Sequence, residues 1–449
     1  MLCASCRKEQ FVTGDDAWIR FSVDTLYFDT LFSTVGSVTK YCKAYNPHKH
    51  SIRIRRVDLE SGNSYFRLNI DGRKADNAKD IVLKPRDSIY IFVEAMIDSD
   101  ALFVVAEGAI VFTIENKRQN IRLVAWSRDV HKLQGVTFFN DTFLTAEKPY
   151  LVYGKMKVAP GVRLDIDSGA SLYFHKGAGL YVEGNLCVQG SINKPVLFAG
   201  DRPEEIYDDI PGQWDGIYLH NASVDNSMSY VVIRNAVSGI QIGQVDNLGL
   251  KPRLELHNCF IRDMSYAGIV AFNAQIIASN CLIANCGSYA IRMCGGGDYL
   301  FYHSTVANYY QYNSRFTPSV FFSNTQMVYG VEEKNNLSVK FFNSIIYGNT
   351  QNEIEVGNNN TEALFEYFFG HCLIRSSSMD ISDKTKFTGI ITSDPQFYDI
   401  KEYNFSLKNT SPAINKGNSD YAMLYPYDVR GHSRMADVAP DMGTIEYCK

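Results

Sequence analysis

The hydrophobic and polar positions in the second half of the chain follow one recurring four-residue pattern. An Asn or His is followed by a small residue, then by any residue, and then by a β-branched aliphatic residue. The five copies are 258–261, 280–283, 303–306, 343–346 and 371–374. Successive copies begin 22, 23, 40 and 28 residues apart. A short strand that recurs about every 20 to 30 residues predicts a solenoid built from stacked coils. The long interval between the third and fourth copies predicts either an extra coil or a loop protruding on one face.

Residues 146–200 consist of short hydrophobic segments, each closed by Gly or Pro-Gly. Strands this short suit the sides of a coil, where each pairs in parallel with the coil below and the glycines allow sharp corners. Further along the chain, two strands return in the same order in each coil. We therefore expect residues 146–449 to form a parallel β-helix of about eight to ten coils with a C-terminal closing segment.

Residues 18–145 carry a different pattern, in which alternating hydrophobic and polar segments are separated by turns. Residues 51–59 alternate almost strictly and place Ile52, Ile54 and Val57 near one face. About seven such segments predict an immunoglobulin-like β-sandwich. The Cys-Trp-Cys signature of antibody domains is absent, so the prediction concerns architecture alone.

The regular spacing of the Asn and His residues favours a structural role, because every coil needs them whereas catalysis would need them only once. Each side chain can bond to its equivalent one coil away, or it can simply tolerate the left-handed conformation at a corner. His303 and His371 are expected to substitute for Asn in this position. Cys259, Cys281 and Cys372 also share one position of the repeat. We expect them to be free thiols stacked in the core, with disulfides as the alternative.

The overall composition narrows the function classes. The net charge is −5 and no basic tract stands out, which disfavours nucleic-acid binding. No stretch of 18 apolar residues is present, so no membrane-spanning helix is expected. The abundant Tyr and Phe residues and the lack of 3.6-residue periodicity favour β structure with few helices.

The N-terminus resembles the end of a bacterial lipoprotein signal, in which small residues precede a lipidated cysteine. Ala4 and Ser5 precede Cys6, and charged residues follow it, as in the tether of a surface lipoprotein. The basic and apolar parts of a signal peptide are missing. We expect residues 1–17 to be a lipoprotein tether with Cys6 lipidated, and the alternative is a flexible tail with ordinary cysteines.

The C-terminal segment resembles the closing motif of bacterial surface β-helix proteins, Ser-Pro-Ala-Ile-x-x-Gly, Asp-x-x-Gly-x-x-Arg and Asp-x-Gly-x-x-Glu. The residues that carry it are Ser411, Pro412, Ala413, Ile414, Gly417, Asp428, Gly431, Arg434, Asp441, Gly443 and Glu446. The coils resemble the right-handed parallel β-helix of the pectin-lyase-like superfamily. Together with the N-terminal half, this is similar to Bacteroidota surface lipoproteins that join a β-sandwich to a β-helix. The resemblance implies an all-β chain, export and lipid anchoring at the outer membrane.

Enzymes of that superfamily need clustered acidic or basic side chains, and the sequence does not show such a cluster. Polygalacturonase-type enzymes combine paired aspartates with Gly-His-Gly and Arg-x-Lys, whereas here 208–209 is the only Asp-Asp pair in the coils and neither companion motif follows. We therefore predict no catalytic residue, no metal and no cofactor. The most suggestive cluster is a ligand groove formed by Arg262, Arg292, Asp298 and Tyr302. The alternative is that the Gly-Gly-Gly before Asp298 is a corner and Asp298 caps the turn.

The leading functional hypothesis is a non-catalytic binding or adhesion scaffold at the cell surface, monomeric, with a glycan or an outer-membrane protein as its partner. The alternative is a divergent polysaccharide lyase or glycoside hydrolase acting on a uronate-containing polymer. Function is expected where the repeat breaks, at 201–213, 295–298 and 307–340.

Overall fold

The computed structural model divides the chain into two compact units, which are described separately. One comprises residues 1–130 with 203–205, and the other comprises 131–202 with 206–449. The structure describes residues 10–32, 36–61, 65–74, 77–98, 103–245, 250–357 and 362–448.

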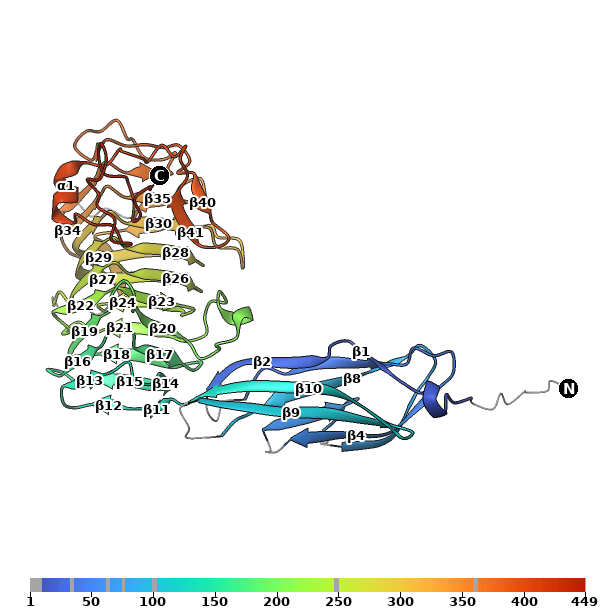
Figure 1. Cartoon of the computed structure of the whole chain (residues 1–449). Coiled ribbons are helices and arrows are strands. Elements are labelled where there is room, and N and C mark those ends of the chain that lie inside the picture. The colour runs from blue at the N-terminus through green and yellow to red at the C-terminus, as the bar shows by residue number, and fades with distance from the viewer. Residues whose placement is uncertain are drawn as a thin grey trace. The chain divides into compact units, whose positions relative to one another are not determined.

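The first unit is a β-sandwich of two five-stranded sheets, which confirms the predicted architecture (Figure 1). One sheet has the order β1 (Arg20–Phe21), β3 (Lys40–Tyr45), β8 (Ser88–Ala95), β5 (Phe66–Ile70) and β6 (Arg73–Lys74). The other has the order β2 (Thr25–Phe32), β10 (Lys117–Arg128), β9 (Phe103–Ile114), β4 (Ile52–Ser61) and β7 (Asn77–Leu83). Alternation along β4 buries Ile52, Ile54 and Val57 in the core between the sheets.

The second unit is a parallel β-helix, as the recurring pattern predicted. One side is a ten-stranded parallel sheet with one strand per coil (Figure 1). Its strands are β11 (His131–Gln134), β14 (Tyr150–Tyr153), β17 (Ser171–Phe174), β20 (Val196–Gly200), β23 (Val231–Arg234), β26 (Phe260–Met264), β28 (Leu282–Cys286), β30 (Thr305–Asn308), β35 (Ile345–Gly348) and β38 (Leu373–Ile374).

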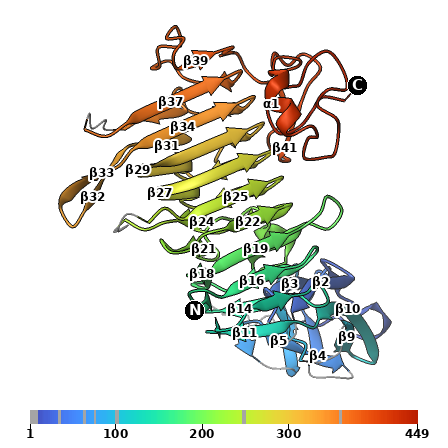
Figure 2. The same ribbon diagram turned by 90° about the vertical axis from the view of Figure 1, so that its left-hand side faces the viewer.

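A 17-stranded sheet supplies the other two sides, as two rows of parallel strands (Figure 2). The first row is β12 (Thr137–Phe138), β15 (Lys155–Val158), β18 (Gly179–Val182), β21 (Gly216–Leu219), β24 (Ser238–Ile242), β27 (Ala267–Ser279), β29 (Tyr289–Tyr302), β31 (Val320–Phe322) and β36 (Ile354–Val356). The second row is β13 (Thr142–Leu144), β16 (Arg163–Ile166), β19 (Asn185–Gln189), β22 (Asn226–Ser229), β25 (Arg253–His257), β27, β29, β34 (Leu337–Phe342), β37 (Phe365–Gly370) and β39 (Phe387–Thr388).

The strands β27 and β29 belong to both rows because each bends around the corner between them. In β29 the corner is made by Gly295, Gly296 and Gly297, which all have positive φ. A Cβ at Gly297 would lie 2.5 Å from the carbonyl oxygen of Ala274, so only glycine fits there. The triple glycine is therefore a corner, which was the structural alternative considered for this segment.

The β-helix begins earlier than the sequence pattern indicated. The boundary expected at 145/146 lies instead between Val130 and His131. The reason is that β11, β12 and β13 pair in parallel with β14, β15 and β16, so they form the first coil. Residues 131–145 were assigned to the sandwich because the first coil contains a single glycine, Gly135, whereas residues 150–170 of the next coil contain three.

The long interval between His303 and Asn343 contains a protruding hairpin. The strands β32 (Thr325–Val328) and β33 (Val331–Lys334) pair antiparallel with each other, and Figure 2 shows them projecting beyond the stacked strands. Of the two predictions for this interval, an extra coil or a protruding loop, the protruding loop is confirmed.

The recurring Asn and His residues lie at a corner of the coils, and both proposed reasons for them apply. Asn258, Asn280, His303, Asn343 and His371 all adopt left-handed φ values between 47° and 56°. In addition, Asn280 Nδ2 donates to Asn258 Oδ1 at 2.9 Å, and Asn343 Nδ2 lies 3.3 Å from His303 Nε2. The repeat is therefore part of the frame of the β-helix.

The cysteines of the repeat are free thiols buried in the core, as expected. Cys259, Cys281 and Cys372 are completely buried. Each Sγ lies within 3.6 Å of a backbone carbonyl oxygen one coil away. Regular inward stacking of thiols thus takes the place of disulfides at these positions.

The C-terminal segment packs over the Asn corner and contributes a buried ion pair. The Arg434 side chain is completely buried and donates to Glu446 Oε1 at 2.5 Å, to Asn280 Oδ1 at 2.6 Å and to the carbonyl oxygen of Thr444 at 3.3 Å. The Thr444 hydroxyl in turn donates to the carbonyl oxygen of Cys281 at 3.0 Å. The Thr444 backbone N–H donates to Thr305 Oγ1 in the next coil at 2.9 Å, so the closing motif joins the C-terminal segment to the frame of two coils.

Candidate functional site

One line of outward-facing side chains crosses the first row of the 17-stranded sheet. In register from coil to coil, these residues, here called the outer row, are Lys157, Tyr181, Tyr218, Gln241, Val270, Arg292, Phe321 and Glu355. The preceding residue of each strand points inward and is completely buried, from Met156 to Ile354. Strand alternation thus gives a line of outward positions with one side chain per coil. All of these side chains are at least partly exposed except Val270, which is 3% exposed.

A pocket of about 270 Å³ lies at the N-terminal end of the outer row. Its residues include Lys155, Lys157, Tyr181, Glu183, Tyr218, His220 and Gln244. The rings of Tyr181 and Tyr218 stack at 4.8 Å between centroids, and Lys155 Nζ lies 5.1 Å from the Tyr181 centroid. Burial raises the pKa of both tyrosines, so they remain neutral hydrogen-bonding groups. The two lysines give the pocket a cationic edge suited to a carboxylate.

A second cavity, here called the acidic cleft, lies on the side of the ten-stranded sheet. Its volume is about 300 Å³. It is lined by Asp209, Asp263, Asn285, Tyr310, Gln311, Tyr312, Ile400, Lys401 and Tyr403. These residues come from the loop between β20 and β21, from the strands β26 and β28, from the segment after β30, and from the turn between β40 (Phe397–Asp399) and β41 (Asn404–Leu407). Segments far apart in the sequence therefore converge on one small cavity.

Asp263 is the most unusual group in the acidic cleft. It is only 2% exposed and adopts a left-handed φ of 60°. The Tyr403 hydroxyl donates to its Oδ1 at 2.9 Å, and Arg262 donates to its Oδ2. Burial outweighs these contacts and raises the pKa of Asp263 to about 6. A carboxyl group with this pKa can exchange a proton near neutral pH.

The second carboxylate of the acidic cleft, Asp209, lies close to Tyr312. Burial and a hydrogen bond to Asp209 raise the pKa of the Tyr312 hydroxyl. The Coulombic influence of Asp209 also contributes to the raised pKa of Asp263. The cleft thus places a carboxyl group with a raised pKa, Asp263, near a second carboxylate, Asp209.

The four residues predicted to form a ligand groove are dispersed. Arg262 lies on β26 in the ten-stranded sheet, 4.4 Å from the Tyr403 ring centroid, whereas Arg292 lies on β29 in the outer row. The expectation that Arg262 and Arg292 share a flank is therefore wrong. Both were assigned to one flank because each lies near a Gly-Ile or Ala-Ile pair, but Arg262 precedes the corner of its coil, whereas Arg292 follows one.

Asp298 and Tyr302 lie on the second half of β29, beyond the glycine corner. Asp298 Oδ2 forms a 3.1 Å ion pair with Lys251 Nζ. The Tyr302 ring stacks on Phe342 with centroids 5.1 Å apart and lies 5.2 Å from the Tyr425 ring. These two residues contact different neighbours and do not meet Arg262 in a common groove. Cys6, the predicted lipidation site, lies outside the described residues.

Sequence reasoning missed the importance of Asp263 and Tyr403. The Asp-Asp pair at 208–209 was noted but set aside, because the companion motifs of polygalacturonases are absent. The sequence did indicate where the site would lie, because residues 201–213 and 307–340 were predicted to be functional breaks in the repeat. These two segments contribute Asp209, Tyr310 and Tyr312 to the acidic cleft. Nothing in the sequence pairs Asp263 with Tyr403, 140 residues away.

Membrane-spanning helices and metal-binding clusters would each indicate a class of function. Within the described part of the chain, no helix is long and apolar enough to cross a membrane. In the same residues, no three His, Cys, Asp or Glu side chains come together in a way that could hold a metal ion.

Comparison with known proteins supports the fold. A family model described as a right-handed β-helix region matches residues 205–367. No curated protein matches the chain. The β-helix is thus shown at the level of architecture, in agreement with the parallel rows of strands.

Two solved structures show limited similarity. A family 123 glycoside hydrolase from Clostridium perfringens, studied for glycolipid glycan hydrolysis, is similar over 25% of this chain and 26% of its own, with 8% identity and a TM-score of 0.19. The chain therefore spans about a quarter of the length of that hydrolase. A PapD-like domain of human CEP192 is similar over 25% of this chain and 84% of its own, with 8% identity and a TM-score of 0.18.

Proposed function

We propose that the protein is a non-catalytic binding scaffold that holds a carboxylated glycan along the outer row. The observation that carries this proposal is the regular register of the outer row, which presents an accessible side chain in every coil except that of Val270, where the side chain is only 3% exposed. It begins with the cationic edge of Lys155 and Lys157 and contains Arg292 further along. Because a polymer also repeats its binding groups along one direction, a surface of this form suits a chain-like ligand.

The size and charge of the outer row favour an oligosaccharide over a small molecule. Neighbouring coils are about 4.8 Å apart, so the seven intervals between Lys157 and Glu355 span about 34 Å. Lys157 has no acidic partner among the described residues and is exposed. A glycan carboxylate would supply that partner, and neighbouring polar groups such as Gln241 could bond to hydroxyls.

The test is a calorimetric titration of the full chain with a uronate oligosaccharide. Lys157→Ala and Arg292→Ala are each expected to weaken binding about tenfold, because each removes one charge-assisted contact. Lys176→Ala is the matched control, since Lys176 is an exposed lysine in the turn after β17. Affinity should also fall as salt is added. Equal affinities for all four proteins would overturn the proposal.

We further propose that the protein is a lipoprotein exposed on the outer membrane of a Bacteroidota-like bacterium, with an outer-membrane protein as a second class of partner. The support is the sequence Ala4-Ser5-Cys6 with its charged successors and the C-terminal closing motif. In cells that carry the native upstream sequence, Cys6→Ala should abolish labelling by a fatty-acid analogue, whereas Cys3→Ala should leave it intact. Labelling that persists in Cys6→Ala would contradict the assignment.

The acidic cleft favours a second candidate, a divergent polysaccharide hydrolase or lyase in which Asp263 donates or accepts a proton. Its test is incubation with uronate polymers, followed by assays for new reducing ends and for unsaturated products. Under this alternative Asp263→Asn should reduce product release by a factor of about 100 or more, because general acid–base catalysis typically contributes that much. Asp298→Asn serves as the control, since Asp298 is an ion-paired acid outside the cleft. Absence of product from the wild-type protein would exclude this candidate for these substrates.

A further inference from the structure

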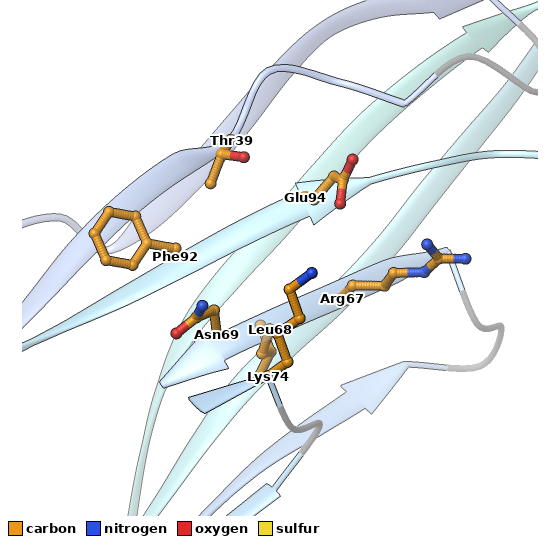
Figure 3. Close-up of a pocket in the computed structure, with 7 residues that line it drawn as sticks. All are labelled: Thr39, Arg67, Leu68, Asn69, Lys74, Phe92 and Glu94. Atoms are coloured by element: carbon orange, nitrogen blue, oxygen red, sulfur yellow. The ribbon is translucent and has the colours of Figure 1, made fainter. Parts of the chain in front are cut away.

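The outer face of one sheet of the sandwich contains a cavity of about 590 Å³ that the functions considered so far do not use (Figure 3). Its lining residues are Thr39, Arg67, Leu68, Asn69, Lys74, Phe92 and Glu94. All of them lie in the sandwich unit, on or beside the strands β3, β8, β5 and β6. The site is therefore separate from both the outer row and the acidic cleft.

Strand register explains why these side chains share one face. Tyr41 pairs with Phe92, Phe92 with Asn69, and Asn69 with Lys74, so one line of outward residues crosses four strands. One step along, Arg67 pairs with Glu94. The alternate residues of β3, β8 and β5 are buried in the core of the sandwich. The cavity therefore sits on a rigid sheet, whose core fixes the spacing of the outward groups.

The aromatic residues of this face remain accessible. Tyr41, Tyr90 and Phe92 are 55%, 40% and 37% exposed, although each is a large ring. Their centroids lie within 6.1 Å of one another, and the Tyr90 and Phe92 rings are nearly parallel, with an interplanar angle of 12°. An exposed aromatic cluster of this kind costs solvation free energy in the free protein and marks a binding surface.

The polar residues around the cavity lack partners of their own. Within the described part of the chain, Arg67, Lys74 and Glu94 form no ion pair or side-chain hydrogen bond. The Asn69 Oδ1 atom is buried and accepts no hydrogen bond. Figure 3 shows the Lys74 ammonium group between the Asn69 and Glu94 side chains and the Phe92 ring at one end of the group. The cavity therefore offers two cations, one anion, an amide and an aromatic ring.

We propose that this cavity binds a saccharide that carries a carboxylate. A sugar ring places its weakly positive C–H groups on the negative face of an aromatic ring such as Phe92. Its hydroxyls can donate to Glu94 and Asn69 and accept from the cations. Because two cations face a single acidic residue, one positive charge is left over, and a carboxylate on the ligand balances it. A purely apolar peptide would leave these charges without partners in the interface, which is unfavourable.

The proposal goes beyond the outer row, because it gives the sandwich a site of its own for the same chemical class of ligand. Calorimetry on the full chain with a uronate oligosaccharide therefore has a distinctive expected result, which is two sites per chain. Phe92→Ala and Arg67→Gln should each weaken the sandwich site about tenfold or more and leave one strong site. Lys157→Ala should weaken the other site about tenfold instead.

The matched control is Tyr27→Ala, because Tyr27 is 57% exposed on the opposite sheet of the same sandwich. Because Arg67 is exposed, Arg67→Gln should not disturb folding, so lost binding in this variant cannot be attributed to misfolding. Far-UV circular dichroism of each variant checks that it is folded. The probe is compared with the same oligosaccharide after its carboxylates have been reduced to alcohols. We expect the reduced probe to lose at least tenfold in affinity at the sandwich site.

The outcomes separate the two proposals. One site that is weakened in Lys157→Ala and unchanged in Phe92→Ala and Arg67→Gln would overturn the sandwich site and support the outer row. One site with the opposite response would overturn the outer row and support the sandwich site. Equal binding of the reduced probe at the sandwich site would overturn the carboxylate requirement.

Discussion

Replacing Arg434 tests whether the closing segment stabilises the β-helix through its buried ion pair. The side chain is completely buried, and its partner Glu446 is only 8% exposed. Arg434→Ala removes the bonds to Glu446, to Asn280 and to the Thr444 carbonyl. Breaking a buried pair by removing one partner typically costs about 3–5 kcal/mol, because the remaining charge is left in a poorly solvated place. We expect the free energy of unfolding of the β-helix unit to fall by about 3 kcal/mol, the lower end of this range.

The lower end is expected because Glu446 can take up a proton. Burial raises its pKa to about 7 even with Arg434 beside it, and loss of the arginine charge raises that pKa further. A raised native pKa makes stability fall as pH rises from the unfolded value of about 4.5 through the native value. The difference between Arg434→Ala and the wild type should therefore be larger at about pH 8.5 than at about pH 6, where Glu446 is protonated for much of the time.

The assay is urea unfolding followed by far-UV circular dichroism at the two pH values. Arg430→Ala is the control, because Arg430 is exposed in the same segment, and a surface change of this kind typically stays within about 0.5 kcal/mol. The double variant Arg434→Met with Glu446→Leu should recover part of the loss, since it removes the unpaired Glu446 carboxylate but leaves the buried Asp428 and Asp441 without the arginine charge. An Arg434→Ala protein as stable as Arg430→Ala, or a loss independent of pH, would refute this account of the closing segment.

Three further predictions follow from single features. Asp263→Asn should flatten the pH dependence of stability between about pH 4 and pH 6, because the wild-type carboxyl, with its raised native pKa of about 6, loses stability as pH rises through that window; a slope that is unchanged in pH-dependent urea unfolding would contradict the assignment. In the native protein, iodoacetamide should modify the exposed Cys448 but not Cys286, which is completely buried and has a raised pKa. Cys286 should react only after urea unfolds the chain, and mass spectrometry that finds Cys286 alkylated in the native protein would contradict its burial in the core. Gly297→Ala should lower the free energy of unfolding by at least about 2 kcal/mol more than Gly177→Ala does. Both positions have positive φ, but only Gly297 has a backbone atom within 2.5 Å of the added Cβ. Equal melting temperatures of the two variants would show that the corner can relax.

Much of the architecture could be predicted because it depends on local rules applied many times. The alternation in residues 51–59 predicted a sandwich strand, and the repeated Asn or His with its aliphatic partner predicted the coils. Each coil packs against its neighbours in the same way, so similar residues recur at equivalent positions of the sequence. The domain boundary was misplaced by 15 residues because the first coil has no coil before it and contains a single glycine.

The candidate site could be predicted only in part. The breaks in the repeat were recognised as the places to look, and residues from two of them line the acidic cleft. The predicted cluster of Arg262, Arg292, Asp298 and Tyr302 is dispersed because a strand's face depends on where its coil turns. Arg292 and Asp298 are only six residues apart, yet the glycine corner of β29 separates them onto two sides of the β-helix.

The sequence by itself determined which residues point inward, because alternation and the coil repeat are local properties that hydrophobic burial enforces in every strand. It therefore specified the sandwich, the solenoid, and the recurring Cys and Asn or His positions of the coils. Only the tertiary structure decided which outward residues meet, since those encounters depend on chain closure over long separations. Tyr403 reaches Asp263 across 140 residues, and Arg434 reaches Asn280 across 154. Register between strands places Phe92 beside Asn69 and Tyr218 beside Gln241, and no local pattern encodes that choice.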